Sequence, residues 1–348
     1  METSNYYVER NRKGNEKLKL LIKDLPEFCL EFFVGKANST SILTRLGYAQ
    51  DYLIFFQFLS ENIPAFYGKK TNEFTLTDLN KITSTCVEEY LNFLSYYDRN
   101  GETYSNDLVT KSRKLASIRA LFLYFYRKNL LKENVTQKVA NPKIPRKEIV
   151  RLNNEEVSDL ITIAENGSGL TQRQHSYNKI TSKRDVAILS LFLGTGIRIS
   201  ELVGINIEDI DFASCGFTIT RKGGNRAILY FNEEVKDSLQ LYLQERKDKE
   251  KENFPISPAF FISIQNKRMG VRAVEKLVQK YAKIVSPLKP ITPHKLRSTF
   301  GTSLYRATKD IYVVAEVLGH KDVNTTKKHY AAISEDIKRE ASTKVKLR

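Results

Sequence analysis

The sequence predicts a mainly α-helical protein of two domains that carries one small antiparallel β-sheet. Apolar residues recur at the spacing of amphipathic helices through most of the 348 residues. Strand patterns are confined to a short stretch, residues 216–231, with a weaker one at 259–263. A basic segment punctuated by prolines, residues 141–147, indicates an extended connection between domains. We therefore expect a helical domain over residues 1–140, a linker over 141–150 and a second domain over 151–348.

Four helices are expected in the first domain, at about residues 15–34, 40–62, 84–100 and 105–130. The second helix places a strongly apolar run behind polar cap residues. Thr85 and Glu88 have the spacing of a capping box, which puts the start of the third helix at Ser84 or Thr85. The fourth is basic in its first half and apolar in its second, as expected of a helix with one end on a polyanionic partner and the other in a core.

The second domain is expected to begin with two helices separated by an irregular insertion, residues 166–182. The Gly-Thr-Gly sequence that ends at Gly196 then stops an apolar helix and turns the chain into a new one. Strands at 217–220 and 227–230 flank Gly-Gly-Asn, which is typical of a hairpin turn. Farther on, Pro293 starts a helix and Gly319 ends the next one.

The net charge of +16 is distributed unevenly. Residues 1–100 hold 12 Lys and Arg against 13 Asp and Glu, whereas residues 101–150 hold 11 against 4. A strong basic excess indicates a polyanionic partner. Because the excess begins abruptly near residue 111, we interpret it as a specific basic surface and not as general solubility.

Several classes of protein are disfavoured by the composition. The three cysteines, Cys29, Cys86 and Cys215, are isolated, which suits reduced thiols in the cytoplasm. With four histidines and no Cys-x-x-Cys pair, we expect no metal site. No apolar run reaches the roughly 18–20 residues that a membrane span requires. The N-terminal residues lack the pattern of an export signal. We expect a cytoplasmic protein without membrane association.

Six side chains in the second domain suit chemistry on a phosphodiester: Arg198, Lys222, His294, Arg297, His320 and Tyr330. A guanidinium presents a planar fork that matches two phosphate oxygens. Fixed donors of this kind stabilise charge that develops on phosphorus. A tyrosine can then hold the phosphate covalently. The set predicts attack on a nucleic-acid backbone by a tyrosine.

The local setting of these residues supports that interpretation. Glu201 lies one turn after Arg198, where it can hold the guanidinium. Lys222 occupies the hairpin turn, from which an ammonium can protonate a leaving oxygen. His294 and Arg297 are three residues apart and share a helix face that we expect to lie outside the core.

Each residue also has a plainer interpretation when taken singly. Arg198 would be a surface ion pair, and Lys222 a solvated turn residue. His320 would be a helix cap, because it follows the helix-ending glycine. Tyr330 would be a packing residue like most of the 18 tyrosines. The presence of all six, in this order, favours the functional interpretation.

These motifs resemble the tyrosine recombinase (integrase) family, and more narrowly the Xer-type recombinases. The segments Thr220–Arg226, Thr292–Arg297 and Leu304–Lys309 look closest to the single-protein XerS type. The motifs span about residues 184–335, and a weaker likeness extends over the N-terminal helices. The resemblance implies a two-domain DNA clamp, with a helical (SAM-like) core-binding domain followed by a catalytic domain.

The resemblance also implies a mechanism and a cofactor requirement. Tyr330 attacks the scissile phosphate to give a 3′-phosphotyrosine and a free 5′-hydroxyl, and the other five residues are catalytic. The 5′-hydroxyl of a partner strand then reverses the bond. Because the covalent link conserves the phosphodiester energy, no metal, ATP or other cofactor is expected, in keeping with the absence of a Gly-x-x-x-x-Gly-Lys-Ser/Thr loop.

Basic residues from both domains are expected to contact DNA. Four lie where the charge changes abruptly, and two flank Lys222. The full set is Arg45, Lys111, Arg113, Lys114, Arg119, Arg221, Arg226 and Arg272.

The sequence departs from the family pattern at two points. Ten positions separate His320 from Tyr330, where many members have nine, and this leaves His329 as a possible neighbour of the phosphate. Ser298 stands where Xer proteins commonly carry a second histidine. Neither departure removes a required group.

The implied partner is double-stranded DNA with an inverted-repeat recombination site, bound by a homodimer on one site and a homotetramer on two synapsed sites. Residues 334–348 begin like a capped helix and contain little apolar surface, so we expect this segment to dock between protomers. The sequence leaves open whether the role is chromosome dimer resolution, integration and excision, or inversion.

Two other functions remain open. A type IB topoisomerase resembles this residue set but relaxes supercoils without exchanging partner strands. A DNA-binding regulator that has lost catalysis is the second alternative, although a mere binder needs no placed phenol.

Overall fold

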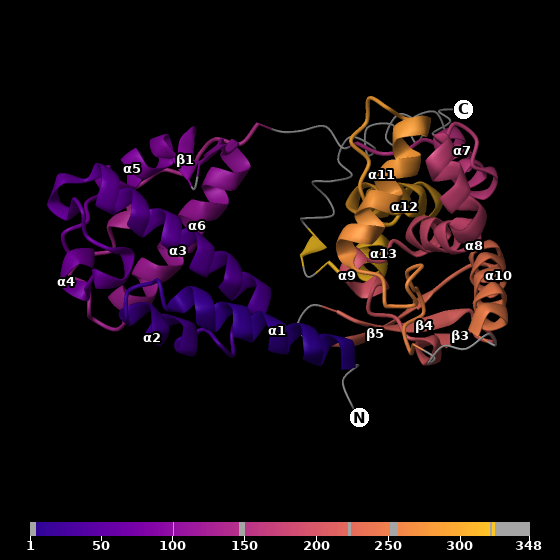
Figure 1. The fold of residues 1–348 in the computed structure, drawn as a ribbon, viewed down its shortest axis with the longest axis horizontal. Coiled ribbons are helices and arrows are strands. Elements are labelled where there is room, and N and C mark those ends of the chain that lie inside the picture. Colours follow the sequence, from indigo (N-terminus) through magenta and orange to yellow (C-terminus); the bar gives the residue numbers. More distant parts are fainter. Residues whose placement is uncertain are drawn as a thin grey trace, which may run out of the picture. The chain divides into compact units, whose positions relative to one another are not determined.

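The computed structural model describes residues 5–99, 101–145, 150–221, 224–250, 257–320 and 322–323. The chain divides into two compact units, Met1–Lys147 and Glu148–Arg348, which are described separately. Both are mainly helical, and the second holds the small antiparallel sheet that the sequence predicts (Figure 1). The first also holds a two-stranded antiparallel sheet, which the sequence does not predict. Among the described residues, no helix is long and apolar enough to cross a membrane.

Unit 1 is built around α3, whose apolar run supplies the fully buried rings of Tyr52, Phe55 and Phe56. Helices α1, α5 and α6 pack against α3. Thus most of the aromatic residues of this unit serve its core. The elements are α1 (Asn5–Ile22), α2 (Phe28–Gly35), α3 (Ile42–Asn62), α4 (Leu76–Leu79), α5 (Ser84–Phe93), α6 (Leu108–Arg127), the 3₁₀ turns η1 (Pro64–Phe66), η2 (Thr71–Glu73) and η3 (Val135–Gln137), and the hairpin of β1 (Tyr97–Arg99) and β2 (Glu102–Tyr104).

Two predictions for unit 1 are wrong in detail. The expected helix over 15–34 is two helices, because Pro26 lacks the N–H that a continuous helix needs. The helix expected to reach residue 100 ends at Phe93 and is followed by the β1–β2 hairpin. This hairpin is stabilised by the stacked rings of Tyr97 and Tyr104, whose centroids lie 5.5 Å apart.

The start of α5 is predicted correctly, but its cap is not. Thr83 is the N-cap, and its hydroxyl accepts a hydrogen bond from the Cys86 N–H at 3.3 Å. The predicted capping box of Thr85 and Glu88 is therefore not the device that starts this helix.

Unit 2 is built around the long helix α8, which packs against α7, α10 and α12. Its sheet has the order β3-β4-β5, and Phe217 of β4 pairs with Leu229 of β5. The elements are α7 (Asn154–Asn166), α8 (Gln172–Thr195), α9 (Ile199–Leu202), η4 (Ile207–Asp209), β3 (Ile210–Asp211), β4 (Gly216–Thr220), β5 (Arg226–Tyr230), α10 (Glu233–Glu250), α11 (Val271–Val285), α12 (Pro293–Thr308) and α13 (Ile311–Leu318).

The irregular insertion expected over residues 166–182 is mostly helical. Thr171 caps α8, and Gln174 closes the capping box, so the helix begins at Gln172. Asn178 is buried and its amide donates to the carbonyl of Ala164 at 2.8 Å and to the Tyr281 hydroxyl at 3.0 Å. The polar composition suggested a loop, but these partners satisfy the polar groups within the unit.

The third strand also differs from the prediction. Residues 259–263 form only isolated bridges, from Ala259 to Asn206 and from Ile262 to Arg268. The third strand of the sheet is β3, which is too short to show an alternating pattern.

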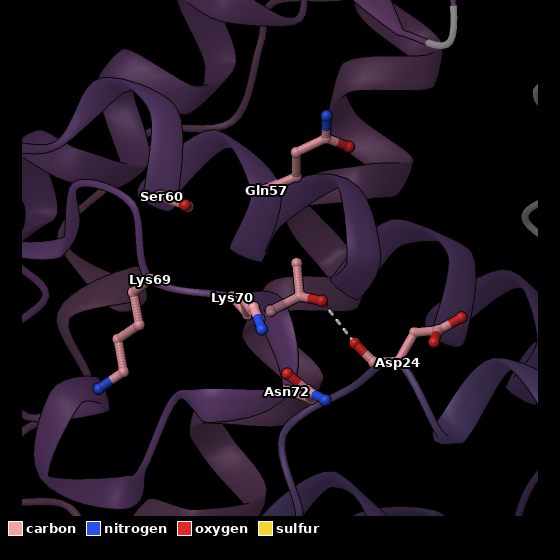
Figure 2. Close-up of a pocket in the computed structure, with 7 residues that line it drawn as sticks. Asp24, Gln57, Ser60, Lys69, Lys70 and Asn72 are labelled. Carbon is pink, nitrogen blue, oxygen red and sulfur yellow. Dashed lines mark hydrogen bonds between the residues drawn. The ribbon is translucent and has the colours of Figure 1, made fainter.

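A hollow of about 390 Å³ lies on unit 1 (Figure 2). The Thr71 hydroxyl donates to the carbonyl of Asp24 at 2.6 Å, and Lys69 is paired with Asp78. None of the predicted DNA-contacting residues of the described part of unit 1 lines it. The lining residues are Asp24, Gln57, Ser60, Lys69, Lys70, Thr71 and Asn72.

Candidate active site

The C-terminal turn of α13 is the centre of the candidate site. Gly319 adopts the left-handed conformation, with φ of 61°. Its N–H donates to the carbonyl of Glu316, and the His320 N–H donates to that of Ala315, each at 2.9 Å. This Schellman-type ending satisfies two of the terminal carbonyls. Within the described part of the chain, no backbone N–H donates to the carbonyls of the next three residues, Val317, Leu318 and Gly319.

Three arginines from three different elements donate to these successive carbonyls. Arg221 donates to Val317 at 3.4 Å, Arg297 donates to Leu318, and Arg198 donates to Gly319 at 3.0 Å. The carbonyl end of a helix carries partial negative charge, which favours cations. A carbonyl orients a guanidinium without cancelling its charge. The turn therefore gathers three positive groups on the residues that directly precede His320.

Arg198 is held by a carboxylate as well as by the turn. It is the N-cap of α9, and its Nη1 donates to Oε1 of Glu201 at 2.9 Å. The Arg198 N–H donates to the other oxygen of the same carboxylate at 2.9 Å. Glu201 is buried, while 34% of the Arg198 side chain remains exposed. The prediction that Glu201 holds this guanidinium is confirmed.

Arg297 lies deeper. Pro293 occupies the first turn of α12, and Arg297 follows one turn later with an exposed fraction of 5%. Its Nη1 donates to the carbonyl of Gly196 at 2.5 Å, at the point where α8 ends. The prediction that its helix face lies outside the core is wrong for Arg297, because the C-terminal ends of α8 and α13 both contact its guanidinium. His294, on the same helix, is exposed.

Gly196 shows how tightly these helix ends are packed. Its φ of 62° favours glycine. A Cβ at this position would overlap the ring of Phe300 and lie 2.9 Å from Cδ2 of Leu318. The same glycine thus ends α8 and allows α12 and α13 to approach it.

The structure thus brings together Arg198, Arg297 and His320, and places His294 one turn from Arg297 on α12. Lys222 and Tyr330 lie outside the described residues. Arg221 joins the cluster although we predicted it as a DNA contact: it is half-buried against the α13 turn. Among the described residues, no group of three or more His, Cys, Asp or Glu side chains is placed to hold a metal ion.

The prediction that α6 contacts DNA through Lys114 is corrected by the structure. The Lys114 side chain is 6% exposed, and its ammonium donates to Asp51 of α3 at 3.3 Å. Arg113 makes a forked pair with the same carboxylate at 2.5 and 2.8 Å. Burial lowers the pKa of Lys114, whereas the hydrogen bond with Asp51 raises the pKa of Arg113. Lys114 therefore joins two helices and does not face a partner.

The prediction that Arg119 contacts DNA is corrected for a similar reason. Its guanidinium donates to the carbonyls of Thr136 at 3.2 Å and Val139 at 2.6 Å, and to the amide oxygen of Asn141 at 2.6 Å. These bonds hold the chain that follows η3 against α6. Arg119 is thus an anchor for the start of the predicted linker.

The other predicted DNA contacts keep some exposure. Arg113, Arg226 and Arg272 are exposed, and Arg45 and Lys111 are half-buried. Lys111 donates to the Ser95 hydroxyl at 2.6 Å.

A helical protein whose helix ends gather several guanidiniums beside a histidine has the character of a phosphoryl-transfer enzyme. The chain belongs to the phage integrase family, whose model matches residues 150–336, and within it to the Xer-type tyrosine recombinases. The family prediction is therefore confirmed.

Two relatives illustrate the similarity. The tyrosine recombinase XerC of Caldanaerobacter subterraneus is 32% identical over 330 residues, covering 92% of this chain and 86% of that protein. The tyrosine recombinase XerS of Lactococcus lactis strain SK11 is 30% identical over 348 residues, covering 93% and 96%. Because these identities are nearly equal, the narrower likeness to XerS stays a prediction.

Solved structures share the fold. The XerH site-specific recombinase bound to palindromic difH substrate, in a post-cleavage complex, matches with a TM-score of 0.65 at 20% identity, covering 88% of this chain and 82% of that one. The Tn1549 transposon integrase in complex with circular intermediate DNA matches with a TM-score of 0.60 at 18% identity, covering 87% and 94%.

Proposed function

We propose that this recombinase cleaves and rejoins double-stranded DNA at an inverted-repeat site through a 3′-phosphotyrosine on Tyr330. The observation that carries the proposal is the convergence of Arg198 and Arg297 on successive carbonyls of the turn that bears His320. Such donors are oriented before the reaction starts, so no reorganisation is needed as charge develops on the phosphate.

The chemical step balances without an added cofactor. The phenolic oxygen of Tyr330 forms a bond to phosphorus as the bond to the 5′-oxygen breaks. Lys222 donates a proton to the leaving 5′-oxygen, and an imidazole of His294 or His320 accepts the phenolic proton. Attack by the 5′-hydroxyl of a partner strand on the phosphotyrosine releases the tyrosine. The energy of the phosphodiester is kept in the covalent intermediate.

Covalent trapping tests this proposal. A DNA site nicked next to the scissile phosphate loses the short strand after cleavage, so rejoining fails and the protein stays attached. The wild-type chain should accumulate an adduct at the 3′ end. Site binding without an adduct would favour a DNA-binding regulator that has lost catalysis. Relaxation of supercoils without recombination between two sites would favour a type IB topoisomerase.

We assign DNA binding to residues 1–140, the connection to 141–150 and catalysis to 151–348. In the catalytic unit, α11 offers a basic face, because Arg272, Lys276 and Lys283 are exposed and lie on one side of the helix. Basic side chains in such a row suit the phosphates of a DNA backbone. Action on DNA also fits the expected cytoplasmic location.

The salt dependence of DNA binding should separate contacting residues from structural ones. Arg272→Ala should weaken binding and reduce the slope of log Kd against log salt by about 1 unit, because one phosphate contact is lost. Lys114→Met should leave that slope unchanged and lower the stability to urea, because Lys114 is buried against Asp51. Two results would contradict this assignment: a reduced salt slope for Lys114→Met, or an unchanged salt slope for Arg272→Ala.

Lys222→Ala should be rescued by a substrate with a bridging sulfur at the 5′ position. A thiolate leaves without a proton, so the missing general acid is not needed. The measurement compares cleavage rates of sulfur and oxygen substrates for the variant and the wild type. If Lys222→Ala slows cleavage of both substrates equally, Lys222 is not the general acid.

We propose that a homodimer binds one site and a homotetramer synapses two, and that residues 334–348, which lie outside the described residues, dock between protomers. Deleting this segment should spare binding to a single site and impair synapsis and recombination. Sedimentation of the truncated protein on two sites measures this. Assembly of four protomers with recombination at the wild-type rate would show that the segment is passive.

A further inference from the structure

Arg221 lies where the β4–β5 ladder becomes a turn. The last strand pair is Thr220 with Arg226. Beyond it, the Arg221 N–H donates to the carbonyl of Asn225 at 2.8 Å, and the Gly224 N–H donates to the carbonyl of Arg221 at 3.0 Å. The backbone of Arg221 is therefore held by both the ladder and the turn.

The Arg221 side chain leaves the hairpin and packs on the α13 turn. Its guanidinium covers the face of Gly319, where a Cβ would overlap Nη1 and Cζ. Its Nη2 donates to the carbonyl of Val317 at 3.4 Å. Gly319 is therefore required twice, for its left-handed φ and for the space that Arg221 occupies. The hairpin is docked on the turn that also orients Arg198 and Arg297.

This docking does not satisfy all of the donors of Arg221. The buried Nε has no hydrogen-bond partner among the residues that the structure describes, and the bond from Nη2 is long. A buried donor without a partner is costly and calls for an explanation. The hydrogen bonds of its guanidinium therefore do not explain why an arginine stands at position 221. The position in which it holds the backbone of the hairpin explains it better.

We propose that Arg221 is a positioning residue that docks the β4–β5 hairpin on the α13 turn and so brings the next residue, Lys222, to the scissile phosphate. The Cα atoms of consecutive residues are about 3.8 Å apart, so an anchored Arg221 confines where Lys222 starts. The inference rests on the proposed function, because it concerns delivery of the general acid. It adds a contact between the hairpin and the α13 turn, which also orients Arg198 and Arg297.

The sulfur substrate distinguishes a positioning role from a direct one. Arg221→Ala should slow cleavage of the oxygen substrate by at least about tenfold, because general acids contribute roughly 10²–10⁴-fold. The sulfur substrate should be cleaved at nearly the wild-type rate. The double variant Arg221→Ala with Lys222→Ala should be no slower than Lys222→Ala alone. Arg221→Lys, which keeps the charge but not the planar fork, should show the same pattern in a folded protein.

Ile228→Ala is the control on the same hairpin. Ile228 lies on β5, and 59% of this residue is exposed. This variant should cleave both substrates at the wild-type rate.

Three results would overturn the inference: an equal defect of Arg221→Ala and Arg221→Lys on both substrates, additivity with Lys222→Ala, or a defect of Ile228→Ala that the sulfur substrate rescues in the same way. If Lys222→Ala itself is not rescued, the proposed general-acid role fails and the inference falls with it. If Lys222→Ala is rescued and the Arg221 variants are not, the inference alone fails.

Discussion

Tyr330→Phe will bind its DNA site and form no covalent link with it. The change removes one oxygen, which is the proposed nucleophile, and leaves every basic group in place. We therefore expect complete loss of the adduct on a nicked site, with an affinity close to that of the wild type. Denaturing gels measure the adduct, and gel shifts measure binding.

His329→Ala is the control for this assignment. His329 is adjacent to Tyr330, and the ten-residue spacing from His320 leaves it as an alternative neighbour of the phosphate. We expect His329→Ala to retain the covalent adduct. An adduct formed by Tyr330→Phe, together with its loss in His329→Ala, would show that another group is the nucleophile.

Arg198→Lys and Arg297→Lys will each cut cleavage by about 10²–10³-fold, or roughly 3–4 kcal/mol, with little change in site binding. Removing one preorganised donor from a site of this kind has an effect of that size. A lysine keeps the charge but cannot bond its structural acceptor and a phosphate in the forked geometry. Single-turnover cleavage and gel shifts measure the two effects.

The two variants should differ in stability. Arg297 is buried and bonds the carbonyls of Gly196 and Leu318, and a lysine cannot satisfy both. An unsatisfied buried carbonyl costs about 1–3 kcal/mol, so Arg297→Lys should lower the free energy of unfolding by about that amount. Arg198→Lys should lower it less, because a third of that side chain is exposed.

Arg306→Lys is the matched control on α12. Arg306 is exposed in the last turn of the same helix and should tolerate the change without loss of cleavage or stability. Cleavage within a few-fold of the wild type for either Arg198→Lys or Arg297→Lys would contradict the proposed phosphate site.

The sequence by itself determined the features that depend on neighbouring residues. Pro293 starts a helix, Gly196 and Gly319 end helices, and Glu201 reaches Arg198 within one turn. Each of these follows from backbone conformation or from a separation of a few residues, so a short segment contains the cause. The same holds for the β4–β5 hairpin, whose turn sequence and flanking strands are contiguous.

Only the tertiary structure decided which basic residues face outward. Lys114 lies in a basic run, but Asp51 of α3 pairs with it from 63 residues away. Arg119 was assigned to the same surface, yet its acceptors lie in η3 and on the chain that follows it. Helical spacing shows which residues share a face, but not what covers that face. A buried partner far along the chain therefore overrides the local charge pattern.

The arrangement of the site has the same origin. Arg198, Arg221 and Arg297 belong to a short helix, a hairpin and a long helix, and nothing in those segments indicates a common target. They meet at the Schellman-type ending of α13, where no backbone N–H of the described residues donates to the carbonyls of Val317, Leu318 and Gly319. Packing of α8, α12 and the hairpin brings a guanidinium to each of these carbonyls. The residues could be named from the sequence, whereas their convergence is a product of long-range packing.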